Sequence, residues 1–94
     1  MRTGINPGSE WGIILDILRA ISEEEREGEG KAKKTRILQK AYLDRGNFKR
    51  YFDFLVEHGF IGYTTELDGE KGYHLTEKGR DLLPQLKEIS EILH

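Results

Sequence analysis

Residues Lys31 to Tyr51, KAKKTRILQKAYLDRGNFKRY, decide the fold that we predict for this chain. The pattern is typical of two short helices joined by a tight turn, a helix-turn-helix. It contains eight of the fifteen basic residues and a single acid, so its local charge is +7, whereas the rest of the chain carries −9. Concentrated positive charge is typical of a surface that meets a phosphate backbone, although a solvated helical face would carry the same residues. The bases are Lys31, Lys33, Lys34, Arg36, Lys40, Arg45, Lys49 and Arg50.

The first helix of this stretch is predicted from Lys33 to Tyr42. Its apolar residues, Ile37, Leu38 and Ala41, have helical spacing, which leaves the lysines and the arginine outward. Leu43 follows in the turn, where we expect it to fill the core.

The second helix of the stretch is predicted over Arg45–Glu57. Asp44 is a suitable N-cap, and Asn47 stands three residues later, as in a capping box. One face is basic and polar, and the other is an apolar stripe. A DNA recognition helix needs this division, because one face must be buried while the other enters the major groove. The stripe consists of Phe48, Tyr51, Phe52, Leu55 and Val56.

Before this stretch we predict a flexible lead-in over residues 1–8 and a helix that Ser9 caps and that ends near Ser22. Its apolar residues recur at three- and four-residue intervals. The acidic segment 23–30, EEEREGEG, is predicted to be a solvated link. The apolar positions of this helix, which we expect in the core or at its rim, are Trp11, Ile14, Leu15, Leu18 and Ile21.

After this stretch, Gly59 is a natural left-handed helix end, and Phe60–Leu67 is rich in aromatic and β-branched residues. We expect a strand with one face made by Ile61, Tyr63, Thr65 and Leu67. The segment 68–72, DGEKG, predicts a turn, and Tyr73–Leu75 a return strand. Two strands with a charged tip describe a wing, which completes a winged helix-turn-helix domain over residues 9–75.

Residues 76–94 are predicted to form a C-terminal amphipathic helix capped by Thr76. An interior proline, Pro84, predicts either a bend near Arg80 to Leu83 or two helical pieces. The apolar seam either packs on the chain's own first helix or pairs with the same helix of a second chain, and we favour the homodimer. The seam residues are Leu82, Leu86, Ile89 and Leu93.

The composition limits what else the chain can be. Its 94 residues allow one domain, and the absence of cysteine excludes a disulfide framework or a thiolate metal site. No apolar run reaches membrane-spanning length, and the first residues do not resemble a signal peptide, so we expect a cytoplasmic protein. The three histidines are scattered and lack the spacing of a zinc pair. We therefore predict no cofactor, no metal and no enzymatic activity.

The order TRILQKAYL, FKRYFDFLVEHGFI, hairpin and YHLTEKGRDLL resembles the small archaeal winged-helix DNA-binding proteins, including the dimeric chromatin-associated winged-helix proteins of Sulfolobus. The likeness extends from about Trp11 to Leu93, and its most specific parts are residues 34–37 and 75–80. The resemblance implies an α+β, mainly α, winged helix-turn-helix with a three-helix core that binds double-stranded DNA as a homodimer. The tail of this chain is shorter than the coiled coil of those dimers.

Our functional hypothesis is double-stranded DNA binding by a transcriptional regulator or a small chromatin-associated protein. Bases at the start of the second helix would hold phosphates, and the recognition helix 45–57 would lie in the major groove. The alternative is a winged-helix module for protein–protein interaction within a larger complex, in which the basic face meets an acidic partner or the tail docks into the complex. The predicted DNA-binding residues are Lys33, Lys34, Thr35, Arg36, Arg45, Asn47, Lys49, Arg50 and Lys71.

Overall fold

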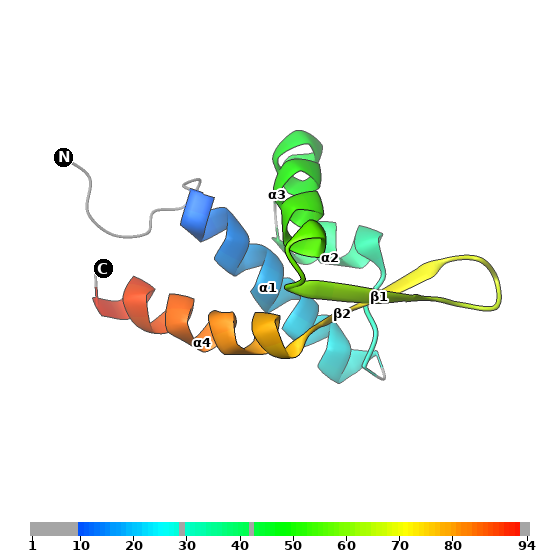
Figure 1. The fold of residues 1–94 in the computed structure, drawn as a ribbon. Helices are drawn as coiled ribbons and strands as arrows, with labels where there is room; N and C mark the ends of the chain where they lie inside the picture. Colours follow the sequence, from blue (N-terminus) through cyan, green and yellow to red (C-terminus); the bar gives the residue numbers. More distant parts are fainter. Residues whose placement is uncertain (1–9, 29, 42, 93–94) are drawn as a thin grey trace.

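The structure is a computed structural model, and it describes residues 10–28, 30–41 and 43–92. Within these residues four helices pack together beside a two-stranded antiparallel sheet, which extends away from them at one side (Figure 1). The predicted lead-in, the Ser9 cap and Leu93 lie outside the described residues. The elements are α1 (Glu10–Glu27), α2 (Lys34–Ala41), α3 (Arg45–Glu57), β1 (Ile61–Thr65), β2 (Lys71–Leu75) and α4 (Glu77–Ile92).

Helix α1 is the centre of the fold, because α2, α3, α4 and β2 all pack against it. Its apolar stripe is buried along almost its whole length, and Ile17, Leu18 and Ile21 are completely inaccessible. The predicted end near Ser22 was wrong, since the helix continues through the acidic segment to Glu27. The helix continues because the buried face does not end at Ile21: Glu24, three residues later on the same face, is only 6% exposed.

The helix-turn-helix has the predicted form. Helix α3 has the predicted bounds, and α2 begins one residue later than expected, at Lys34, while Tyr42 lies outside the described residues. Phe48, Phe52 and Leu55 bury the inner face of α3, while Leu43 is partly buried against the same core. At the end of α3, Gly59 has a φ of 79°, in the left-handed region that glycine adopts without strain.

The two strands pair in register from Ile61 opposite Leu75 to Thr65 opposite Lys71. Ala32, before α2, adds an isolated bridge to Tyr73 that the sequence analysis missed, with two backbone hydrogen bonds of 2.8 Å. The predicted apolar face of β1 was wrong beyond Ile61: Tyr63 and Thr65 are exposed, as is Leu67 in the following turn. The hairpin projects past the helices in Figure 1, so no helix within the described residues covers the outer part of that face.

Helix α4 begins after Thr76, whose side-chain oxygen accepts a hydrogen bond from the Gly79 backbone N–H at 3.1 Å. It is one continuous helix with Pro84 inside, so the alternative of two helical pieces was wrong. Leu83 and Leu86, on either side of the proline, are both buried in the core cluster. This packing holds the helix together across the backbone hydrogen bond that proline cannot donate.

Trp11 differs from its predicted place in the core or at its rim. It lies in the first turn of α1 and is 55% exposed, beside a shallow cleft that it lines with Tyr51 and Phe54. The order of elements along the chain is three helices, a hairpin and a further helix, which is the order of a winged helix-turn-helix domain.

Candidate nucleic-acid interface

The N-terminus of α3 is fixed by its cap. The Asp44 carboxylate accepts a hydrogen bond from the Asn47 backbone N–H at 2.9 Å, and a second from the Asn47 side-chain amide at 2.8 Å. The backbone hydrogen bond is the main cause that lowers the pKa of Asp44 from its ordinary value of 3.8. Asn47, predicted to reach a base edge, is therefore exposed but already holds the cap.

The outward face of α3 carries three bases, Arg45, Lys49 and Arg50, all of them exposed. Lys49 forms an ion pair with Asp53 one turn later, with Nζ and Oδ2 2.7 Å apart. This hydrogen bond raises the pKa of Lys49 and lowers that of Asp53. Arg45 forms no ion pair within the described residues. The Arg50 guanidinium lies 5.7 Å from the centre of the Tyr51 ring, so its charge also remains available at the surface.

The start of α2 presents a second group of exposed residues, Lys33, Lys34 and Thr35. Lys34 lies over the buried Phe52 ring, with Nζ 5.1 Å from its centre. That contact joins the first turn of α2 to the middle of α3, which places the two basic groups on adjoining elements.

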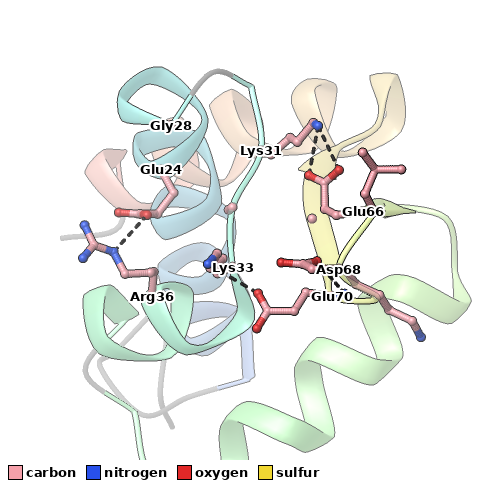
Figure 2. Close-up of a pocket in the computed structure, with 12 residues that line it drawn as sticks. Glu24, Gly28, Lys31, Lys33, Arg36, Glu66, Asp68 and Glu70 are labelled. Atoms are coloured by element: carbon pink, nitrogen blue, oxygen red, sulfur yellow. Dashed lines mark hydrogen bonds and ion pairs between the residues drawn. The ribbon is translucent and has the colours of Figure 1, made fainter.

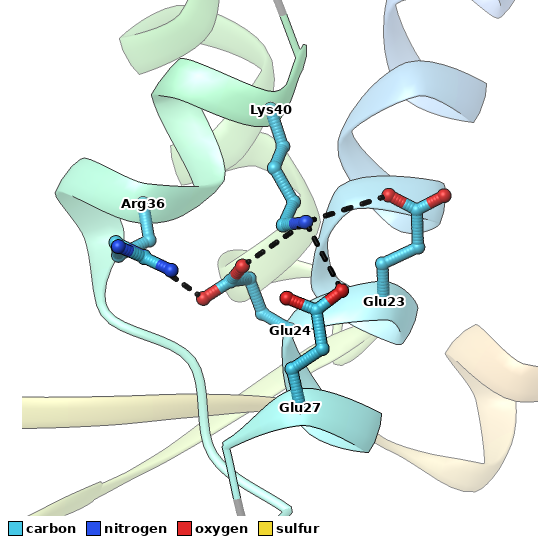
Figure 3. Close-up of polar contacts among 5 residues, drawn as sticks. All are labelled: Glu23, Glu24, Glu27, Arg36 and Lys40. Carbon is cyan, nitrogen blue, oxygen red and sulfur yellow. Dashed lines mark hydrogen bonds and ion pairs between the residues drawn. The ribbon is translucent and has the colours of Figure 1, made fainter.

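Glutamates of α1 neutralise part of the predicted basic surface (Figure 3). Lys40 points toward α1, where its Nζ lies 3.3 Å from Glu27, 3.4 Å from Glu24 and 4.0 Å from Glu23. Arg36 Nε lies 3.4 Å from the other Glu24 oxygen. Lys40 therefore belongs to the α1–α2 contact, whereas Arg36 remains exposed with one nitrogen engaged.

The Glu24 carboxylate is a buried charged group of the α1–α2 contact that was not predicted from the sequence. Its Oε2 is fully buried and makes no hydrogen bond, although it lies at ion-pair distance from Lys40. The opposite charges attract at this distance of 3.4 Å whatever the angle of the N–H bond. A signal was present in the sequence: Ile17, Ile21 and Glu24 follow the four- and three-residue spacing of one helix face.

The wing is acidic near its tip (Figure 2). Glu66 pairs with Lys31 at 2.9 Å, and Glu70 pairs with Lys33 at 3.3 Å. Lys71 lies on the wing itself, with Nζ 4.5 Å from the centre of the Tyr63 ring. Together with Arg36 and Glu24, the two pairs line a cleft of about 760 Å³ between the start of α2 and the wing.

Every predicted DNA-binding residue is exposed, from Lys33 to Lys71. The predicted dimerisation residues divide: Leu86 is buried in the core, Leu82 is partly buried, and Ile89 is 43% exposed. No group of metal-ligating side chains occurs in the described part of the chain. Nor does any described helix have the length and apolar character needed to span a membrane.

Comparison with known proteins agrees with this geometry. Residues 8–94 match the winged helix-turn-helix family, and the chain belongs to it. It is 38% identical to the uncharacterized protein MJ0287 of Methanocaldococcus jannaschii over 86 residues, which are 92% of this chain and 77% of that protein.

Solved structures show the same likeness. The chain resembles Sso10a-2, a DNA-binding protein from Sulfolobus solfataricus, with a TM-score of 0.70 and 33% identity over 90% of this chain and 80% of that one. A MarR-family transcriptional regulator from Silicibacter pomeroyi shares the fold, with a TM-score of 0.70 and 16% identity over 92% and 54% of the two chains. The resemblance to archaeal winged-helix proteins of the Sulfolobus type is thus confirmed.

Proposed function

We propose that the protein binds double-stranded DNA through α2 and α3, with α3 in the major groove, as a transcriptional regulator or a chromatin-associated protein. The observation that carries the proposal is the division of α3. Three bases, Arg45, Lys49 and Arg50, are exposed, while the opposite face is buried and holds the helix rigid. A relative of 33% identity, Sso10a-2, is itself a DNA-binding protein.

The roles follow from side-chain chemistry. Arginine can bind guanine through two hydrogen bonds, so we assign base contacts to Arg45 and Arg50. Lys49 must leave Asp53 to reach DNA, which costs little because ion pairs between exposed side chains contribute little to stability. Lys34, Thr35 and the free nitrogens of Arg36 would hold phosphates, which fixes the register but reads no sequence. Asn47 would support the helix end more than read a base.

The test reverses two charges on the proposed face. The variant Lys49→Glu/Arg50→Glu should lose retardation of a random-sequence duplex on a gel while its thermal unfolding stays close to that of the wild type. Wild-type affinity should also fall steeply with salt, with log affinity decreasing by about 0.9 per log salt for each phosphate neutralised.

A matched control reverses one arginine and one lysine elsewhere. Arg26 and Lys87 are exposed and line a cleft between α1 and α4. The variant Arg26→Glu/Lys87→Glu has the same net charge as the test variant and should keep most of the affinity. Equal loss in both variants would mean that total charge, and not the face of α3, governs binding, and it would refute the assignment.

We also propose that the chain acts as a homodimer in the cytoplasm, by binding and without catalysis. Support for the dimer comes from the end of α4, where Ile89 is 43% and Ile92 is 72% exposed. Trp11 is exposed at the start of α1, and Figure 1 shows this turn and the end of α4 toward the same side of the molecule. An exposed apolar surface of this kind is typical of an interface between subunits.

A further inference from the structure

The cleft between the start of α2 and the wing contains three pairs of opposite charge, and they are of two kinds (Figure 2). In the Arg36–Glu24 pair the carboxylate is only 7% exposed, so it cannot turn into water. In the Lys31–Glu66 pair the side chains are 51% and 36% exposed, and in the Lys33–Glu70 pair 69% and 58%. Exposed pairs contribute little to stability, so the second kind can exchange partners.

The two lysines are held as a unit facing the wing. Ala32 between them is buried, and its backbone N–H and C=O both bond to Tyr73 of β2 at 2.8 Å. Because successive side chains of an extended segment point to opposite sides, Lys31 and Lys33 both point away from the core. Their spacing relative to the wing is therefore set by backbone hydrogen bonds.

The wing is shaped to receive one of these lysines. Gly72 of β2 lies beneath the Lys31–Glu66 pair, and a Cβ added there would be 3.1 Å from Glu66 Oε1 and 3.3 Å from Lys31 Cβ. Lys31 Nζ contacts both Glu66 oxygens, at 2.9 and 3.1 Å. The absence of a side chain at Gly72 lets the pair lie flat against the strand.

We propose that Lys31 and Lys33 form a binding site for backbone phosphates of DNA, and that Glu66 and Glu70 of the wing occupy this site in the free protein. A carboxylate and a phosphate oxygen accept hydrogen bonds from an ammonium group at similar distances. The wing carboxylates thus compete with DNA and lower its affinity. This inference rests on the proposed DNA binding, and it adds Lys31 to the interface.

The experiment measures duplex affinity, by fluorescence anisotropy with a random-sequence duplex, for the wild type and for Glu66→Gln/Glu70→Gln. Glutamine keeps the side-chain shape and removes the charge. We expect the variant to bind about three- to tenfold tighter at low salt, because two exposed ion pairs no longer oppose binding. Its plot of log affinity against log salt should be steeper, by up to about 1.8 for two further phosphates.

Two controls separate competition from a general change of charge. Glu88→Gln/Glu91→Gln removes two exposed glutamates from α4 and should leave affinity nearly unchanged. In a protein that already carries Lys31→Gln/Lys33→Gln, the change Glu66→Gln/Glu70→Gln should have little further effect on duplex affinity. The two lysines for which the glutamates and the phosphates compete are then absent.

The possible outcomes distinguish the competition by the wing from the proposed DNA binding. Wild-type binding with no gain from Glu66→Gln/Glu70→Gln overturns the competition and leaves the proposed function standing. An equal gain without the two lysines would show simple repulsion by the wing, and it would also refute the site. If neither the wild type nor any variant binds the duplex, both proposals are overturned. If Glu66→Gln/Glu70→Gln binds and the wild type does not, both proposals are supported.

Discussion

Glu24 is a buried residue in the acidic segment 23–30, which was predicted to be a solvated link. It lies on the core face of α1, and its two carboxylate oxygens meet Arg36 and Lys40 of α2. A carboxylate with so little exposure is stabilised only if its charge is compensated, so these bases are held where they are. The α1–α2 contact therefore combines a buried apolar stripe with a small ionic cluster at its end.

At this scale we predict that Glu24→Ala lowers the free energy of unfolding by about 1–2 kcal/mol, the cost of removing the acceptor of charged contacts. Urea unfolding measures it. The control is Glu23→Ala, where an exposed carboxylate lies 4.0 Å from Lys40 and the expected loss is below about 0.5 kcal/mol. Similar values for both variants would contradict a special role for the buried carboxylate.

Helix α4 is attached through the motif LTEKG at residues 75–79. The Thr76 hydroxyl donates to the carbonyl oxygen of Gly59 at 2.6 Å, and Lys78 Nζ donates to that of His58 at 2.8 Å. Gly79 faces the Phe60 carbonyl, against which an added Cβ would collide. The motif thus joins the end of α3, the start of β1 and the start of α4, which explains why it predicts the fold more than any function.

At the scale of elements we predict that Gly79→Ala lowers the unfolding free energy by about 2 kcal/mol, because the helix must shift away from the Phe60 backbone. Gly46→Ala is the matched control, since Gly46 is also helical but exposed, and its Cβ would lie 3.4 Å from Asp44 Oδ1. That variant should be neutral or stabilised by up to about 1 kcal/mol, because alanine favours helix over glycine. Chemical unfolding of both proteins provides the measurement, and a stable Gly79→Ala would show that α4 can dock differently.

At the scale of the whole molecule, exposed bases of the proposed DNA-binding face lie on α2 and α3, and exposed apolar side chains lie at the start of α1 and the end of α4. The seam predicted for a dimer is partly used inside the chain, because Leu86 packs in the core. Among the described residues, the exposed apolar surface at the end of α4 and the start of α1 is limited to a few side chains, so we expect a small interface and a dimer that depends strongly on concentration.

At this scale we predict that Ile89→Glu dissociates the dimer, because a charge would be buried in an apolar interface. Sedimentation velocity over a range of concentrations should show the variant as a monomer where the wild type is dimeric. Lys87→Glu introduces a negative charge two residues earlier, at an exposed position on the other side of α4, and should leave the association unchanged. A monomeric wild type at every concentration would refute the dimer.

The sequence alone determined the features that depend on neighbours within a few residues. The bounds of α3, the Asp44 and Thr76 caps and the left-handed Gly59 follow from capping chemistry and helical periodicity, and all were confirmed. The hairpin was also confirmed, although its strands are joined over residues 66–70 and not over the predicted 68–72. These rules act locally, so they can be applied before the chain is folded.

Only the tertiary structure decided which charges are free. Lys31, Arg36 and Lys40 meet carboxylates that lie 35, 12 and 13 residues away in the chain. All three were predicted to belong to one basic surface, because spacing along the chain carries no information about such partners. Folding brings α1 beside α2 and the wing beside the start of α2, and the pairing of opposite charges then depends on distance in space.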